Sequence, residues 1–177
     1  MTSTADIQFR EGTSADVPAM ARCRLADPPN SVADPRMAAY FNGQHHPQQA
    51  LIPRVGYLAM ANDEVIGYIA GHRTTRNGCA GEVQYLFVAP SQRRREIGTA
   101  LLRLLAEWFK AQSARSVCVG IANDSPPESQ AFLRECWRVA AEKKLVLVGR
   151  HRSFAPLMWI TSSRRKTTFG TRYSKST

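Results

Sequence analysis

The sequence has no uninterrupted apolar run close to the roughly 18–20 residues that a membrane-spanning helix needs. Its start, "MTSTADIQFREG", also lacks the apolar segment that a secretory signal carries after its charged residues. These two absences argue against a membrane protein and against a secreted one. We therefore expect a cytoplasmic protein, and its 177 residues are enough for one domain with a substantial core.

Cysteine is scarce, and no two cysteines stand at the short spacing that metal sites and redox motifs use. The four cysteines lie far apart in the chain: Cys23, Cys79, Cys118 and Cys136. We expect reduced thiols and neither a disulfide nor a zinc site. His45 and His46 are adjacent, so in a regular helix or strand they do not point at one ion, and no metal is expected. The sequence also lacks a Walker loop and the nucleophile elbow of serine hydrolases.

Acidic residues are missing from the end of the chain. Nine of the 24 basic residues but none of the 14 acidic residues lie after residue 142. The other 15 basic residues nearly balance the acids, so the net charge of +10 belongs to the end of the chain rather than to its body. We expect a folded domain over residues 1–161 and a basic, disordered tail over residues 162–177.

Two interpretations of this tail compete. It could bind nucleic acid, with Phe169 and Tyr173 available to stack on bases. It could also be an extension without a function. We favour the second interpretation because the tail carries no recognisable nucleic-acid-binding module.

The spacing of apolar residues predicts alternating strands and helices, bounded by proline, glycine and capping residues. The expected elements, in chain order, are a strand (7–12), two helices (13–25 and 36–43), a hairpin (55–61 and 65–73), a strand (82–88), a helix (98–113), a strand (116–121), a helix (123–142) and two strands (144–149 and 157–162). This order predicts an α/β domain with a mixed sheet. His72 ends an expected strand and is interpreted as a hydrogen-bonded histidine at a sheet edge.

The stretch "PSQRRREIGTALL" (90–102) joins the strand at 82–88 to the helix that follows it. The first N–H groups of a helix lack internal partners, and the helix dipole is positive at that end. A diphosphate there would accept several N–H bonds, and the arginines would add charge-assisted ones. The alternative is a solvated run of charges, but cations at a helix N-terminus are unfavourably placed without an anion. The loop therefore predicts an anion site.

The residues around this loop resemble a known family. The segment "EVQYLFVAPSQRRREIGTALLRLLAEWF" is similar to the central motif of the GNAT N-acetyltransferases, in which Arg/Gln-x-x-Gly-x-Gly/Ala follows a strand and opens a helix. Here, residues 93–98 occupy the motif. The resemblance extends to "YLAMANDEVIGYIAGH" and "IQFREGTSADVPAMARCR", so it covers residues 7–123. It implies a GNAT-like mixed, mostly antiparallel sheet flanked by helices, and transfer of an acetyl group from acetyl-CoA to a primary amine by direct attack.

The same resemblance implies where the substrates bind. The diphosphate of acetyl-CoA would lie on the amides of residues 94–99, and the pantetheine arm along the strand at residues 86–88. The implied cofactor-binding residues are Leu86, Phe87, Val88, Arg93, Arg94, Arg95, Glu96, Ile97, Gly98, Thr99, Ala100 and Asn123. The family binds its acceptor near residues 30–55, where Tyr40, His45 and His46 are the candidates. The acceptor would be an amine of a small molecule or a peptide, without a membrane or nucleic-acid partner, and the family makes a homodimer possible.

Glu82 stands at the position of the glutamate general base in one branch of the family. An amine with a pKa near 10.4 arrives protonated, so a base assists its attack. Strict alternation along the strand predicts that Glu82, Leu86 and Val88 share one face, while Tyr85 and Phe87 share the other. The alternative is that Glu82 is a solvated residue at a strand entry, and the sequence leaves both interpretations open.

The sequence departs from the family at two positions. Glu96 replaces the first glycine of the motif, which would weaken CoA binding through backbone strain and charge repulsion. Leu133 stands where many members have a tyrosine that acts as the general acid, and Tyr85 is expected on the wrong face to replace it. Because a thiolate can leave unaided, we expect a slower reaction rather than none. We therefore weigh an N-acetyltransferase against a catalytically weak GNAT-like binding module with a basic nucleic-acid-binding tail.

Overall fold

The computed structural model of the chain describes residues 6–25, 35–121 and 127–151. The strands are β1 (Gln8–Glu11), β2 (Ala50–Ala61), β3 (Glu64–Thr74), β4 (Gly81–Val88), β5 (Ser116–Ile121) and β6 (Val146–His151). The α-helices are α1 (Val17–Leu25), α2 (Pro35–Phe41), α3 (Ile97–Ala111) and α4 (Pro127–Glu142). The short 3₁₀ helices η1 (Ser14–Asp16), η2 (Arg76–Gly78) and η3 (Pro90–Gln92) precede α1, β4 and α3, respectively.

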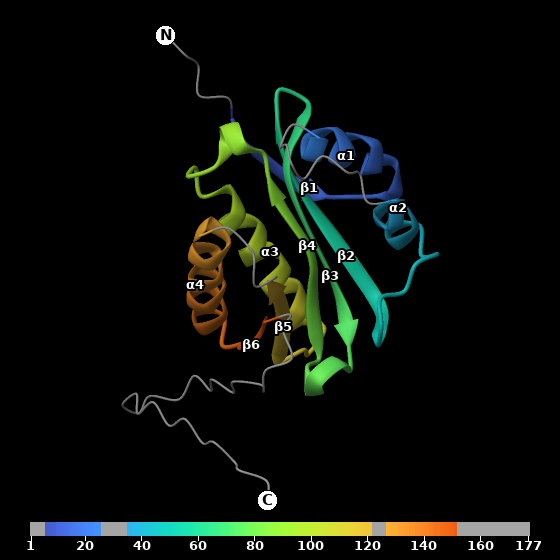
Figure 1. Cartoon of the computed structure of the whole chain (residues 1–177), viewed down its shortest axis with the longest axis vertical. Helices are drawn as coiled ribbons and strands as arrows, with labels where there is room; N and C mark the ends of the chain where they lie inside the picture. Colours follow the sequence, from blue (N-terminus) through green and yellow to red (C-terminus); the bar gives the residue numbers. More distant parts are fainter. Residues whose placement is uncertain (1–5, 26–34, 122–126, 152–177) are drawn as a thin grey trace, which may run out of the picture.

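The strands form one sheet in which they lie side by side in chain order (Figure 1). Strands β1 to β4 are antiparallel to their neighbours, whereas β4, β5 and β6 run parallel. The segments that connect the strands explain the change from antiparallel to parallel pairing. Asn62 and Asp63 both have positive φ and reverse the chain between β2 and β3 in a tight turn, whereas α3 and α4 carry the chain back before β5 and β6. The expected mixed, mostly antiparallel sheet is confirmed.

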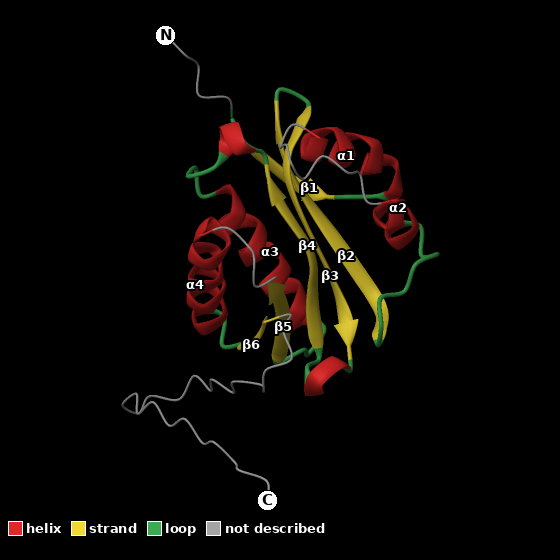
Figure 2. Cartoon of the chain, viewed as in Figure 1, coloured by secondary structure: helices red, strands yellow, loops and turns green. Residues whose placement is uncertain are grey.

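Helices cover both faces of the sheet: α1 and α2 lie on one side, and α3 and α4 on the other (Figure 2). The larger apolar cluster lies under α3, where Leu101, Leu105 and Phe109 repeat at helical spacing. A second cluster under α1 contains Met20 and Tyr68. None of the helices in the described residues is long and apolar enough to cross a membrane.

Strands β4 and β5 stay together over a short distance only. They pair at Gly81–Val83 and Val117–Val119 and no further. Next to this point, the register between β3 and β4 skips Gln84, which is a β-bulge. A bulge bends its strand and increases the local twist, so β4 turns away from β5. Beyond the bulge, β4 stays paired with β3, but within the described part of the chain its other edge, which faces β5, has no strand partner.

Several expected elements differ from the observed ones at their ends or fall outside the description. The strand expected at 144–149 is β6, two residues later, and the helix expected at 98–113 is α3. The strand expected at 157–162, the tail and Asn123 lie outside the described residues. The interpretation of His72 as a sheet-edge residue is wrong, because β3 lies between β2 and β4 and the His72 side chain is fully buried.

Candidate functional site

The loop between β4 and α3 has the geometry of an anion cradle. The chain leaves β4 through η3 and enters α3 at Ile97, with Glu96 as the N-cap residue. Arg94 and Glu96 have φ of 63° and 58°, and the Glu96 side chain makes no capping hydrogen bond. Among the described residues, nothing accepts a hydrogen bond from the amides of residues 94–99. These free N–H groups at a helix N-terminus favour an anion.

The predicted cofactor-binding residues of α3 contribute mainly their backbone. The side chains of Ile97 and Thr99 are buried in the fold, so only their amides are available. A Cβ atom on Gly98 would meet nothing closer than Val88 Cγ2 at 3.8 Å, so the packing of the chain itself does not require glycine there. The missing side chain instead leaves the Gly98 amide open to a ligand.

The three arginines of the loop are exposed, and their surroundings differ. Arg93 donates from Nε to the Val88 carbonyl at 3.1 Å and lies over the Phe87 ring, 6.0 Å from its centroid. Arg95 donates to the Gln92 side chain. Arg94 makes no hydrogen bond or ion pair with another described residue. Arg94 is therefore the arginine whose charge is most available to an anion on the free amides.

The Glu96 side chain is exposed and makes no hydrogen bond to the helix end at which it stands. The pKa of Arg138 on α4 is raised because Glu135 accepts its hydrogen bond, and the charges of Glu142 and Glu96 raise it further. The charge of Glu96 therefore contributes at α4, but no ion pair or hydrogen bond joins the Glu96 side chain to the described residues of that helix. The positive φ confirms that this motif position has the left-handed conformation that glycine adopts most easily. The free amides of the cradle can thus donate hydrogen bonds to a diphosphate, whereas the negative charge of Glu96 would repel it.

The bulge at Gln84 changes which residues of β4 share a face. Val83, Leu86 and Val88 pack into the core under α3, whereas Tyr85 and Phe87 pack with α1 and α2. Glu82 lies on the α1 side as well, because it contacts His72 there. The predicted grouping of Glu82 with Leu86 and Val88 is therefore wrong. One extra residue in a strand shifts its alternation by one, so residues before and after the bulge exchange faces.

Glu82 is almost completely buried, with 8% of its surface exposed. Arg76 Nη1 donates to Glu82 Oε1 at 3.0 Å, and His72 Nε2 lies 3.6 Å from Glu82 Oε2. Burial is the largest single influence on the pKa of Glu82 and raises it, but His72 and Arg76 together outweigh burial. The pKa of Glu82 is therefore lowered, and the carboxylate is ionised at neutral pH. The interpretation of Glu82 as a solvated strand-entry residue does not fit this burial.

Tyr40 is buried behind His72, and 0% of it is exposed. Its hydroxyl lies 3.2 Å from His72 Nδ1, and its ring meets the Tyr85 ring edge-on with centroids 5.5 Å apart. The guanidinium of Arg54 stacks on the Tyr40 ring, 4.7 Å from its centroid. Burial raises the pKa of the Tyr40 hydroxyl, which therefore keeps its proton.

His45 and His46 lie in the connection between α2 and β2, which Arg54 holds in place. Arg54 donates to the carbonyl oxygens of Tyr40 and His45 at 2.6 and 3.0 Å, and Arg54 Nη2 lies 2.9 Å from His46 Nδ1. The His46 side chain is exposed and that of His45 half-buried. The substrate-binding roles of these histidines and of Tyr40 stay predictions.

The structure also brings in residues that the sequence reasoning left out of the site. Arg54, His72 and Arg76 come from β2, β3 and η2, and they surround Glu82 and Tyr40. The strand register brings Arg54 and His72 to Glu82, because His72 lies directly opposite Glu82 on β4 and Arg54 on β2. Leu133 lies on α4 as expected. No group of three or more potential metal ligands occurs within the described residues.

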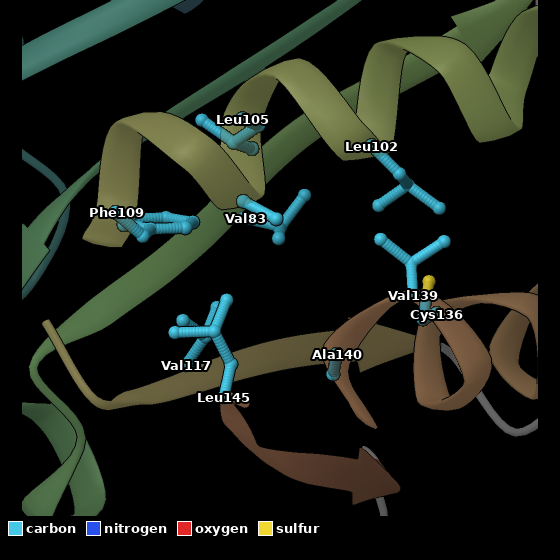
Figure 3. A pocket seen from close by; sticks show the side chains of 10 residues that line it. Val83, Leu102, Leu105, Phe109, Val117, Cys136, Val139, Ala140 and Leu145 are labelled. Carbon is cyan, nitrogen blue, oxygen red and sulfur yellow. The ribbon is translucent and has the colours of Figure 1, made fainter. Parts of the chain in front are cut away.

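An apolar cavity of about 30 Å³ lies apart from these polar groups, between α3, α4 and the sheet (Figure 3). Its wall is formed by Val83, Leu102, Leu105, Ala106, Phe109, Val117, Cys136, Val139, Ala140 and Leu145. It has room for about one water molecule but offers no polar partner to hold one. The cavity therefore belongs to the hydrophobic core and not to the candidate site.

The fold class is a mixed sheet that opens between the parallel strands β4 and β5, with the loop from β4 to α3 forming a candidate anion cradle. The sequence matches the family model described as the acetyltransferase (GNAT) family over residues 18–136. This chain belongs to the GNAT acetyltransferase family. A search of curated proteins finds no significant match.

Solved structures support the fold at low sequence identity. The aminoglycoside N-acetyltransferase AAC(6′)-Iy in complex with CoA is 16% identical, with a TM-score of 0.58 over 94% of this chain and 99% of that one. A GNAT-family acetyltransferase from Staphylococcus aureus Mu50 is 19% identical, with a TM-score of 0.59 over 73% and 82%. A transcriptional regulator from Bacillus halodurans C-125 is 16% identical, with a TM-score of 0.57 over 73% and 91%. The TM-scores establish a shared fold. Sequence identities this low do not identify the acceptor, which depends on the residues of this chain's own site.

Proposed function

We propose that this protein is an N-acetyltransferase that moves an acetyl group from acetyl-CoA to a primary amine by direct attack. The observation that carries the proposal is the row of free amides at the start of α3, next to the unpaired edge of β4. The amides suit a diphosphate, and an unpaired strand edge suits an extended chain that contains amide groups. Acetyl-CoA, when bound, supplies an activated acetyl group. Membership of the GNAT family supports the same activity.

In this proposal, the chain positions the reactants and assists in removing a proton. Arg94 and the amides of residues 94–99 hold the diphosphate, and the backbone at Leu86–Val88 guides the pantetheine arm. The amine nitrogen bonds to the acetyl carbon as the carbon–sulfur bond breaks, and the thiolate takes a proton from water. The proton lost by the amine passes to the Glu82 carboxylate, directly or through one water. Holding the two reactants together contributes most of the rate enhancement.

Replacing Glu82 with glutamine tests its role as the base. We expect kcat to fall about tenfold or more, because positioned general bases contribute factors of this size or larger. The KM values for acetyl-CoA and for the amine should change little, because glutamine has nearly the same shape. Steady-state kinetics between pH 6 and 9 measure the effect. The control is Glu107→Gln on α3, an exposed carboxylate paired with Lys143, which should leave the kinetics as they are. Kinetics of Glu82→Gln that match the wild type over this pH range would remove Glu82 as the base.

The proposed function is tested first by binding and then by turnover. Calorimetric titration with acetyl-CoA measures occupancy of the cradle. The protein is then incubated with acetyl-CoA and a panel of primary amines: a polyamine, an aminoglycoside, an amino acid and a peptide with a free N-terminus. Release of the free thiol and the mass of the acetylated product report transfer. Binding of acetyl-CoA without acetylation of any amine above the protein-free rate would refute the transferase.

The second candidate is a catalytically weak GNAT-like module that acts by binding, with its basic tail on nucleic acid. The specific observation in its favour is the charge of Glu96 at the left-handed position of the cradle, which opposes a diphosphate. This function requires DNA affinity that falls steeply with salt and is lost when the chain is truncated at Ser162. A lack of measurable affinity at low salt would exclude it.

A further inference from the structure

A chain of polar groups crosses the otherwise apolar layer between the sheet and α2. His72 is fully buried on β3, with the Tyr40 hydroxyl 3.2 Å from Nδ1 and Glu82 Oε2 3.6 Å from Nε2. The register places His72 directly opposite Glu82 on the neighbouring strand, so the sheet itself fixes the distance between the two residues. Tyr40, His72 and Glu82 therefore form one row that begins inside the protein and ends at the candidate base.

The hydrogen bond between the Tyr40 hydroxyl and His72 Nδ1 couples the direction of that bond to the tautomer of the ring. The hydroxyl keeps its proton, and His72 Nδ1 is its one hydrogen-bond partner among the described residues. When Tyr40 donates to Nδ1, the single proton of a neutral imidazole must lie on Nε2. The Nε2–H group then points at Glu82 Oε2. The two arginines nearest the row already have partners, because Arg54 lies on the Tyr40 ring and Arg76 binds Glu82.

This arrangement assigns a partner to each oxygen of the Glu82 carboxylate. Arg76 binds Oε1, and the Nε2–H group of His72 faces Oε2. Apart from each other, Nε2 and Oε2 have no hydrogen-bond partner within the described residues. Their separation of 3.6 Å is longer than a good hydrogen bond. Hydrogen bonds of catalytic groups are often long in the free protein and shorten when substrate binds.

Stability alone does not explain such a row. A buried polar pair is weak evidence for stability, because apolar side chains of similar volume are often as stable or more stable. Such a row is explained if proton transfer to Glu82 depends on the orientation of its carboxylate. We propose that His72, held by Tyr40, is a positioning residue that fixes the orientation of the carboxylate of Glu82, the candidate base. This inference rests on the proposed function, and it extends that function to a residue that touches neither substrate.

The first test reads the imidazole directly and needs no acceptor. The full chain is labelled with ¹⁵N-histidine, and the His72 signals, among those of four histidines, are those lost in His72→Gln. We expect the Nε2–H tautomer in the wild-type protein. Tyr40→Phe, which removes one oxygen, should shift His72 towards a mixture of tautomers. The matched control Tyr57→Phe, on β2, should leave the spectrum unchanged. A wild-type His72 with its proton on Nδ1 would overturn the proposal.

The second test is kinetic and uses the amine identified in the acceptor panel. His72→Leu removes the donor, and we expect kcat to fall about 10- to 100-fold while the two KM values change by less than about twofold. In His72→Gln, a side-chain N–H can still reach the carboxylate, so this variant should recover part of the lost rate. Equal losses in both variants, or a change confined to KM, would contradict a positioning role.

The two tests also separate this inference from the proposed function. If no amine is acetylated, the proposed function fails, and the positioning role fails with it whatever the tautomer. If an amine is acetylated but the tautomer or the kcat pattern is wrong, only the role of His72 fails. If His72→Leu does not fold, the tautomer of Tyr40→Phe and the kinetics of His72→Gln decide the question, because both changes are small.

Discussion

Replacing Glu96 with glutamine should tighten the binding of acetyl-CoA about tenfold at low salt. Glu96 is the N-cap residue of the helix whose free amides form the cradle, and its carboxylate makes no capping hydrogen bond there. A negative charge a few ångströms from a diphosphate costs about 1–2 kcal/mol at a solvent-exposed site, and about 1.4 kcal/mol corresponds to a factor of ten. Calorimetric titration at two salt concentrations measures the effect, which should shrink at high salt because the carboxylate is exposed.

Replacing Glu96 with glycine separates backbone strain from charge. The free protein already has φ of 58° at this position, so the strain of about 1–2 kcal/mol is present before any ligand binds. Relief of this strain should therefore stabilise the fold rather than increase affinity. We expect Glu96→Gly to bind acetyl-CoA about as tightly as Glu96→Gln, and to unfold at a higher temperature. The net gain is about 0.5–1 kcal/mol, because glycine also makes the unfolded chain more flexible.

Arg94→Gly is the matched control, since Arg94 has a φ of 63° in the same loop. It should relieve similar strain but weaken the binding of acetyl-CoA, because it removes a cation. If Glu96→Gln and the wild type bind equally well at low salt, Glu96 does not oppose the diphosphate. If the wild type fails to bind and the glycine variant alone binds, the loop conformation rather than the charge is the obstacle.

Replacing Arg76 with alanine should destabilise the protein by about 2–3 kcal/mol at neutral pH, because it leaves the buried Glu82 carboxylate without its cation. For a chain of this size, we expect the melting temperature to fall by about 5–10 °C. The loss should be smaller at pH 5 than at pH 8. Thermal unfolding of the wild type and the variant across this pH range measures both effects.

The dependence on pH follows from the sign of the pKa shift. In the wild type, the pKa of Glu82 lies below its ordinary value of 4.5, so the carboxylate stabilises the fold above that pH and ceases to do so as the pH falls through its lowered pKa. Without Arg76, burial becomes the dominant influence and moves the pKa of Glu82 upward. The ionised carboxylate then destabilises the fold at high pH, and protonation relieves the effect as the pH falls.

Two controls complete this experiment. The double variant Arg76→Ala, Glu82→Gln should recover most of the lost stability, because a neutral amide is buried at lower cost than a charge. Arg10→Ala should cost less than about 1 kcal/mol, although Arg10 lies 2.6 Å from Asp16, because the Arg10 side chain is exposed to solvent. A loss in Arg76→Ala that is equal at pH 5 and pH 8 would contradict the assigned role of Arg76.

Much of the architecture follows from local patterns. The alternating run at residues 82–88, the glycine at 98 and the helical spacing of Leu101, Leu105 and Phe109 place β4, the loop after it and α3 correctly. The tight turn at Asn62 and Asp63 is equally local. These features depend on interactions between residues a few positions apart, which the order of the sequence specifies. The orientation of Glu82 escaped this reasoning, because no local signal marks the bulge at Gln84.

The sequence by itself therefore determined the family, the order of strands and helices, and the position of the loop between β4 and α3. The tertiary structure decided which residues meet: it placed His72 and Arg76 on Glu82, Tyr40 behind His72, and Glu82 on the face opposite to the one expected. These contacts join segments more than thirty residues apart as well as near neighbours, and they depend on strand register. A shift of one residue in register reverses every later side chain, and packing of the whole sheet sets that register.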